Sequence, residues 1–249
     1  MIIYEFPLNE HMRNLLKLER VFQQALHFTR LDDALSHQVA LFAIFDLLDI
    51  MARNDIKSEL QLDLSRLRQR VEFRLEPSGS APIKNEPLDH IDRTLTALQA
   101  LPARLDQALR DHEWLNMVKQ RANVPGGVNG YDLPHYHYWQ HCPSTLRRAN
   151  LIEWLAPALP VQHAIGLILK RLRGQCEPHA LIARQGYYQQ MLNGHNSPLL
   201  RIGLAENETS IPEASANRHA INIRFLTLNT TQSTRCEHDV EFQLSFCQP

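Results

Sequence analysis

The residues of this chain that could do chemistry are concentrated in one stretch, residues 119–142, KQRANVPGGVNGYDLPHYHYWQHC. Its last part contains His135, His137, His141 and Cys142. On a helix, His137 and His141 would share one face, the arrangement that two zinc ligands need. However, no glutamate accompanies them as in H-E-x-x-H, and the other cysteines are not grouped with them. The pattern therefore favours histidines that pack against Tyr and Trp, or that bind an anion, over a metal site.

The glycine-rich segment from Pro125 to Gly130 has the composition of a phosphate-binding loop. It lacks the lysine of G-x-x-x-x-G-K-[ST] and the spacing of G-x-G-x-x-G, and it lies between two helical patterns. We predict a close turn between two helices instead. Asp132 could form an acid–base pair with His135 or His137, but it could equally cap the next segment. With no G-x-S-x-G or other nucleophile motif, the sequence gives no positive case for an enzyme or a cofactor.

Basic side chains occur on four successive segments in the middle of the chain. They are Lys119, Arg121, His137, His141, Arg147, Arg148, Lys170, Arg171 and Arg173. The aromatic residues nearby are Tyr131, Tyr136, Tyr138 and Trp139. If the segments pack together, they form one positive groove with aromatic walls, which suits an acidic peptide with apolar anchors or single-stranded nucleic acid. Separate solvated charges are the alternative that these residues leave open.

The distribution of charge supports an anionic partner. Residues 1–113 hold 14 Lys and Arg against 18 Asp and Glu (−4), residues 114–175 hold 7 against 2 (+5), and residues 176–249 hold 5 against 7 (−2). The whole chain carries −1, so it is not a polyelectrolyte binder overall. A basic middle in a neutral protein favours an acidic peptide, nucleic acid or phosphate as partner, although surface charge also fluctuates without function.

Helical periodicity dominates the first 175 residues. The predicted helices begin after Asn9 and then cover 34–53, 56–75, 88–98, 105–121, a short segment from Pro134, 144–155 and 161–172. The segment from Ala34 to Arg53 is apolar on nearly every face, which indicates a buried central helix. Polar turn residues fill 77–87.

Strand periodicity takes over near the C-terminus. Alternating apolar residues predict strands at 200–204, 221–225 and 240–246, and Ile2 to Phe6 reads as a further strand. Residues 207–217 and 229–235 read as polar connectors. We therefore predict an α+β fold with a helical domain at 8–175, and an antiparallel β domain formed by 1–7 and 176–249 that buries one face of a small sheet.

The four cysteines, Cys142, Cys176, Cys236 and Cys247, are widely spaced. This spacing favours reduced buried thiols in a cytoplasmic protein over a disulfide framework. The N-terminus shows no signal-peptide pattern, and the apolar run from Val39 to Ile50 is too short to span a bilayer. We expect a soluble cytoplasmic protein with no membrane partner.

Two motifs resemble the ZapD family of bacterial cell-division proteins. Residues 4–13, YEFPLNEHMR, resemble that family's F-E-x-P-L-N-E-x-M-R opening. Residues 121–127 and 131–143 resemble its R-x-x-x-P-G-G and [FY]-D-L-P-x-x-H-x-W-x-H-x-P signature. The resemblance extends over essentially the whole chain, including 186–189, 199–201 and 223–225.

The resemblance implies a non-enzymatic cytoplasmic homodimer without cofactors that acts at the mid-cell division site. ZapD-like proteins bind the acidic C-terminal tail of the tubulin-like GTPase FtsZ and cross-link its filaments into bundles that support the division ring. A disordered acidic tail would become ordered on binding to a basic, aromatic-lined cleft, and a dimer offers two such clefts. A nucleic-acid-binding protein that uses the same groove remains the alternative.

Carried over residue by residue, the family's basic surface implies a set of partner-binding residues. They are Arg13, Lys17, Arg110, Arg121, His137, His141, Arg147 and Arg224. Lys17 stands where some relatives have Arg, which keeps the charge but loses the fork geometry. Glu113 stands where some have a basic residue, which changes the edge of the cleft near Trp114. If His137 and His141 bind the tail, we expect tighter binding as the pH falls from about 8 to 6.

Overall fold

A computed structural model describes most of the chain. The described residues are 1–53, 55–75, 86–102, 107, 111–192, 197–217, 219–228 and 233–248, without the side chains of 53, 74, 75, 86, 228 and 233. They divide into two compact units. The β-rich unit consists of Met1–Asn14 and Leu169–Pro249, and the helical unit consists of Leu15–Ile168.

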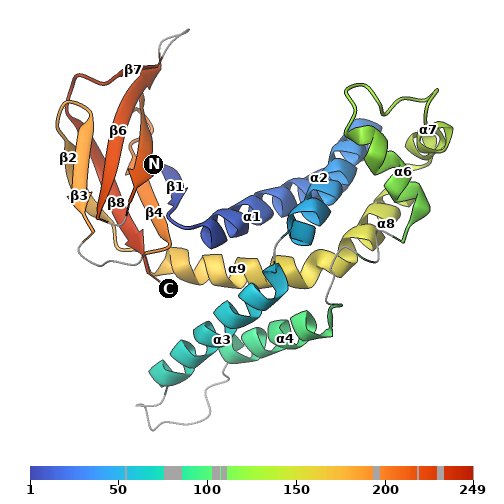
Figure 1. The fold of residues 1–249 in the computed structure, drawn as a ribbon, viewed down its shortest axis with the longest axis horizontal. Coiled ribbons are helices and arrows are strands. Elements are labelled where there is room, and N and C mark those ends of the chain that lie inside the picture. Colours follow the sequence, from blue (N-terminus) through green and yellow to red (C-terminus); the bar gives the residue numbers. More distant parts are fainter. Residues whose placement is uncertain are drawn as a thin grey trace. The chain divides into compact units, whose positions relative to one another are not determined.

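The helices lie in the first 174 residues (Figure 1). They are α1 (Glu10–Thr29), α2 (Ala34–Arg53), α3 (Ile56–Leu75), α4 (Glu86–Ala100), α6 (Glu113–Ala122), α7 (Pro134–His141), α8 (Ser144–Leu155) and α9 (Leu159–Gly174), with the 3₁₀ turn η1 (Ala156–Ala158) between the last two. The prediction of one helix over 105–121 is wrong at His112. This residue has an extended backbone and caps α6, accepting a hydrogen bond from the Leu115 N–H. Most residues before it lie outside the described part of the chain.

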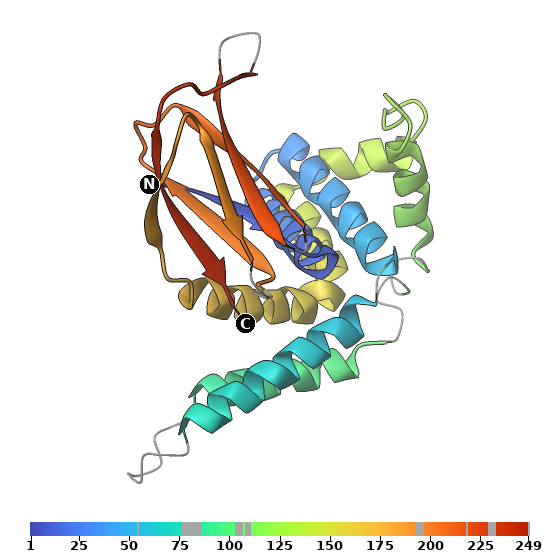
Figure 2. The same ribbon diagram turned by 60° about the vertical axis from the view of Figure 1, so that its left-hand side comes forward.

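α2 is the core helix of the helical unit, as its all-round apolar sequence predicts. Ala40, Leu41, Ile44 and Leu47 are at most 1% exposed. Two described stretches, 34–52 and 144–174, are long and apolar enough to cross a membrane by length and composition. Half of the first is buried inside the protein, as in the core helix of a soluble fold. α3 and α4 form a helical hairpin, and Figures 1 and 2 both show them side by side.

The strands form two antiparallel sheets. They are β1 (Ile2–Pro7), β2 (His179–Ala183), β3 (Tyr187–Met191), β4 (Leu199–Leu204), β5 (Ser210–Ala216), β6 (Ala220–Leu228), β7 (Ser233–Arg235) and β8 (Val240–Cys247). One sheet has the order β1-β4-β8-β2; the other has the order β3-β6-β5, with β7 also paired to β6. The N-terminal strand β1 pairs with β4, Ile2 opposite Leu204, as the α+β prediction allowed.

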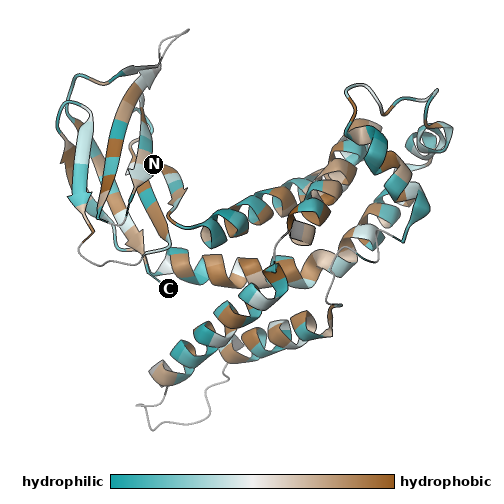
Figure 3. Ribbon diagram, viewed as in Figure 1, coloured by the Kyte–Doolittle hydropathy of each residue, from teal (hydrophilic) through white to brown (hydrophobic). Residues whose placement is uncertain are grey.

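The β-rich unit has a core shared by the two sheets. Ile202 and Leu244 from one sheet and Ile223 and Phe225 from the other lie in a single cluster and are at most 1% exposed. The apolar residues appear as brown bands along β4, β6 and β8 in Figure 3. The α+β fold class is confirmed, but the expected single small sheet is wrong, because two sheets pack against each other. The connector expected over 207–217 is also wrong, since it contains β5.

Two links hold the end of α9 to the first sheet. The Arg173 guanidinium donates two hydrogen bonds to the Glu5 carboxylate on β1, at 2.8 and 2.7 Å. A disulfide joins Cys176 to Cys247 at the end of β8. The expectation of reduced thiols is therefore wrong for this pair, because the fold brings together two cysteines 71 residues apart. Cys142 and Cys236 remain free thiols.

Candidate partner-binding surface

The segment between α6 and α7 is a compact turn built on side-chain and backbone hydrogen bonds. The Val124 N–H donates to Arg121 O at 3.0 Å, and the Gly127 N–H donates to Val124 O at 2.8 Å. Asn129 then organises the entry to α7, because its Oδ1 accepts from the Asp132 N–H at 2.8 Å and its Nδ2 donates to the Asp132 carboxylate at 2.9 Å. The prediction of a close turn between two helices is confirmed. Asp132 thus helps to build the entry to α7.

Two glycines of this turn lie in close contact with neighbouring groups. A Cβ at Gly127 would lie 2.4 Å from Arg121 O, closer than any real contact. A Cβ at Gly130 would lie 2.8 Å from Nδ1 of His137, so the His137 ring packs directly on this glycine. Gly126 has φ +69°, a conformation that favours glycine. The turn therefore fixes where α7 begins, and the His137 ring lies against it.

An aromatic cluster lies where α6, α7 and α8 meet. The Trp114 ring centroid is 5.3 Å from that of Trp154, 5.8 Å from that of Trp139 and 6.3 Å from that of Tyr136. Trp139 and Tyr136 are 7% and 1% exposed. Burial raises the pKa of Tyr136 far above its usual value, so its hydroxyl stays protonated. These rings pack α7 on α6 and α8; Tyr136, Trp139 and Trp154 are buried, and Trp114 is partly exposed.

The opposite face of α7 is open to solvent. Tyr138 is 74% exposed, Tyr131 just before the helix is 86% exposed, and both His137 and His141 are exposed. The two imidazole centroids lie 4.4 Å apart, and His141 Nδ1 lies 2.8 Å from His137 O. Arg121, in the last turn of α6, is also exposed. We call Arg121, Tyr131, His137, Tyr138 and His141 the α6–α7 surface.

Neighbouring cations are already paired with carboxylates or carbonyls. Lys119 Nζ lies 2.5 Å from Asp49 Oδ1 on α2. Arg148 Nη2 lies 2.7 Å from Asp32 Oδ1. Its Nε donates a hydrogen bond of 3.1 Å to Thr29 O. These two residues join elements of the helical unit, so they add less to the positive potential than the sequence implies.

Arg147 is buried, with 6% of its surface exposed. Its guanidinium donates to His37 Nδ1 at 3.0 Å, to Gln140 O at 3.0 Å and to Asp32 O at 2.7 Å, and also to Cys142 O. With these donors engaged inside the protein, Arg147 has a structural role, and the geometry argues against a direct contact with a partner. The sequence alone does not distinguish it from its half-exposed neighbour Arg148.

The remaining expected residues lie on other elements. Arg13 and Lys17 are exposed on α1, four residues apart and so on one face of the helix. Arg224 is exposed on β6, where its register partners are Tyr187 and Glu213. Arg110 lies outside the described residues. Glu113 is exposed in the first turn of α6, where its charge favours the helix N-terminus.

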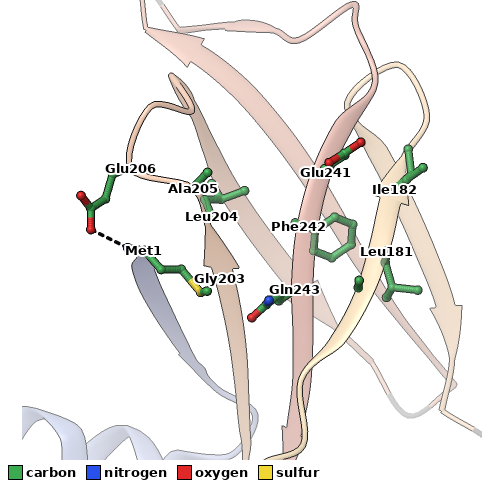
Figure 4. Close-up of a pocket in the computed structure, with 11 residues that line it drawn as sticks. Met1, Leu181, Ile182, Gly203, Leu204, Ala205, Glu206, Glu241, Phe242 and Gln243 are labelled. Atoms are coloured by element: carbon green, nitrogen blue, oxygen red, sulfur yellow. Dashed lines mark hydrogen bonds and ion pairs between the residues drawn. The ribbon is translucent and has the colours of Figure 1, made fainter.

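At least three hollows, of about 740, 720 and 510 Å³, open on the described part of the β-rich unit, and two of them bear on binding. One, of about 740 Å³, lies over the first sheet and is drawn in Figure 4. The Met1 thioether lies over Gly203, where a Cβ would be 2.9 Å from the sulfur, and Glu206 and Glu241 stand at the rim. The Met1 ammonium group is paired with the Glu206 carboxylate at 2.5 Å. The other, of about 510 Å³, is lined by Phe6, Leu8 and Arg13 and by Ala214 to Ala216 of β5.

No group of three or more His, Cys, Asp or Glu among the described residues could hold a metal ion. What the α6–α7 surface offers is cationic and aromatic contact. Its histidines and Arg121 can pair with carboxylates, and its two exposed tyrosines can cover apolar side chains.

Comparison with known proteins identifies the class. Residues 16–224 match the ZapD family, described as a cell division protein. The chain is 38% identical over 248 residues to the cell division protein ZapD of Aromatoleum aromaticum, covering 99% of this chain and 97% of that protein. It is 38% identical over 250 residues to ZapD of Dechloromonas aromatica, covering 99% of each. It is 37% identical over 251 residues to ZapD of Chromobacterium violaceum, covering 100% of each.

These matches run the length of the chain and define a bacterial cell-division protein. The chain belongs to the ZapD family. The resemblance seen in the two sequence motifs is confirmed. The relatives bear names of cell-division proteins and not of enzymes.

Proposed function

We propose that this protein binds the acidic C-terminal tail of FtsZ in the cytoplasm at the division site and, as a homodimer without enzymatic activity, cross-links FtsZ filaments. Membership of a cell-division family supports the cellular role. The observation that carries the proposal is the α6–α7 surface, where Arg121, His137 and His141 are exposed. The two exposed tyrosines beside them add apolar contact area.

The chemistry of this surface suits a disordered acidic segment. Carboxylates gain charge-assisted hydrogen bonds to arginine and to protonated histidine, and tyrosine faces cover apolar side chains at a low entropy cost. A flexible tail loses conformational freedom on binding, so each contact is weak. Two sites on a dimer would offset this weakness, because the second contact forms at high effective concentration.

Fluorescence anisotropy of a labelled FtsZ tail peptide tests the proposal. The wild type should bind in a salt-sensitive manner, and Arg121→Glu should weaken binding about tenfold or more, through lost attraction and new repulsion. Arg70→Glu is the matched control, since Arg70 is an exposed arginine on a different helix, α3. Arg147→Glu is unsuitable, because it would disrupt the fold around a buried guanidinium.

Two further measurements separate the alternatives. Sedimentation velocity should give a dimer, and pelleting of FtsZ filaments should increase with the wild type and not with Arg121→Glu. A folded dimer that ignores the tail peptide but binds single-stranded oligonucleotides with steep salt dependence would replace this proposal by the nucleic-acid-binding alternative.

A further inference from the structure

The outer edge of β5 is an open strand edge in the β-rich unit. β5 is the last strand of its sheet among the described residues, with β6 on its other side. Strand edges carry main-chain donors and acceptors that pair with an added strand. The hydrogen bonds of β6 show which β5 residues turn their main-chain N–H and C=O groups toward the open edge.

The orientation of the β5 backbone is fixed by Phe225. Its N–H donates to Gly186 O at 2.8 Å and its C=O accepts from the Cys236 N–H at 3.0 Å, so both groups point away from β5. Pro212, its register partner, is therefore in a non-hydrogen-bonded pair and turns its backbone outward. Proline at this position fits, since the edge loses no internal hydrogen bond. By alternation, Ala214 and Ala216 also turn their main-chain groups outward.

One end of this edge is closed by the protein itself. The Ser210 N–H donates to Glu208 Oε1 at 2.9 Å, which blocks an added strand there. Pro212 is buried, and the edge is open from the partly exposed Ala214 to the exposed Ser215 and Ala216. The open edge thus offers both main-chain groups of Ala214.

The hollow of about 510 Å³ lies directly beside this edge. Phe6 and Leu8 supply apolar walls and Arg13 stands on the same lining. The Arg13 side chain is 52% exposed, and its Nε lies 3.2 Å from the exposed Glu10 carboxylate. An exposed ion pair of this kind is weak and leaves other guanidinium N–H donors available. The volume lies within the usual range for ligand pockets, about 300–1,000 Å³.

We propose that the β5 edge is a strand-addition site for an extended segment of an acidic tail. The segment pairs with the main chain of Ala214 and places one apolar side chain against Phe6 and Leu8. A carboxylate two residues along, on the same face of the strand, reaches Arg13. The residue between them faces the exposed Glu213 and is not acidic. The inference rests on the proposed function for the identity of the tail.

Proline substitution at the edge tests this geometry. Ala214→Pro removes the outward N–H without breaking the ladder to β6, and Pro212 shows that this edge accepts proline. Ile3→Pro is the matched control on the edge strand β1. The Leu8 N–H points toward the β4 side, because it donates to Pro198 O at 2.9 Å. Backbone groups alternate along a strand, so the N–H of Ile3, five residues earlier, points outward from the sheet edge.

The readout is binding of the labelled FtsZ tail peptide. We expect Ala214→Pro to weaken binding at least about tenfold and Ile3→Pro to leave it within about twofold. In the wild type, the Ala214 amide should gain protection from hydrogen exchange when the peptide is added, a readout that does not depend on any variant folding.

Each contrary result has a distinct meaning. Wild-type affinity in Ala214→Pro, with an unprotected Ala214 amide, overturns the strand-addition site while the proposed function stands. Loss of the dimer in Ala214→Pro would mean that the edge pairs with a second copy and would also overturn it. No binding of the peptide to the wild type overturns both proposals together.

Discussion

Arg147 Nε donates a 3.0 Å hydrogen bond to Nδ1 of His37, and both side chains are buried. The same guanidinium also donates hydrogen bonds to Asp32 O, in the link between α1 and α2, and to Gln140 O, at the end of α7. One buried cation therefore ties together three elements of the helical unit, beside the turn that carries the α6–α7 surface. The acceptor role of Nδ1 requires His37 to be neutral.

The first prediction concerns stability against pH. Burial lowers the pKa of His37, and the positive charge of Arg147 and Arg148 lowers it further. A depressed folded-state pKa contributes stability above the unfolded pKa, about 6.5, and this contribution is lost as the pH falls through the folded value. We expect urea unfolding to show lower stability at pH 5.5 than at pH 7.5. The slope from this residue is at most about 1.4 kcal/mol per pH unit.

A non-titrating acceptor provides the control. His37→Gln keeps an oxygen that can accept from Arg147, so the variant should lose part of the pH dependence between these values. If its stability profile parallels that of the wild type, His37 is not the group responsible.

The second prediction compares the two arginines of α8. Arg147→Met removes the donor from three partly buried carbonyl groups and from the buried Nδ1 of His37, and it should reduce the free energy of unfolding by about 3 kcal/mol. Arg148→Met, at a half-exposed site, should cost about 1 kcal/mol or less. Equal losses in chemical denaturation would contradict the structural role assigned to Arg147.

The sequence predicts these elements better than it predicts their side-chain roles. Apolar periodicity locates α2 and β8, because burial of a face leaves a repeat in the chain. Apolar periodicity does not distinguish Arg147 from Arg148. The two arginines are adjacent on α8, and they differ in whether the side chain points into the protein or toward solvent. The spacing of Tyr136 and Trp139, three residues apart, is a signal that those two rings face inward.

Two other features could not be predicted from local pattern. β5 has the sequence SIPEASA, whose small and polar residues reflect an edge strand with little to bury. The Cys176–Cys247 disulfide depends on the end of α9 meeting the end of β8, a long-range contact that spacing does not reveal. The boundaries expected for the two domains, at residues 8 and 175, stay a prediction.

The third prediction uses two glycines in opposite settings. Gly127→Ala would place a Cβ 2.4 Å from Arg121 O, so the turn must shift, and we expect a loss of more than about 1 kcal/mol. Gly166 lies within α9, with nothing within 4 Å of an added Cβ. Gly166→Ala should stabilise the protein by about 0.5–1 kcal/mol. Thermal unfolding of both variants measures these changes in stability. A similar change in melting temperature for the two variants would contradict the packing described for the turn.

The fourth prediction concerns the disulfide. Protein unfolded without reductant should show two reactive thiols out of four cysteines, those of Cys142 and Cys236. Cys176→Ser should lower stability by about 2–4 kcal/mol under oxidising conditions, because it frees a long loop in the unfolded chain. Reductant should lower wild-type stability similarly and leave the variant unchanged, with Cys142→Ser as the control. Four reactive thiols in the untreated protein would show that the bond does not form.

The last prediction concerns pH and tail binding. His137 and His141 are exposed with ring centroids 4.4 Å apart, so protonation of both places two positive charges side by side. Imidazoles gain charge as the pH falls from about 8 to 6, and a carboxylate bound between the rings would offset their mutual repulsion. We therefore expect tail affinity to rise over this range and to rise less in a His137→Ala, His141→Ala double variant. His163→Ala, at an exposed position on α9, should keep the wild-type profile. Affinity that stays flat with pH in the wild type would mean that these two histidines do not contact the acidic tail.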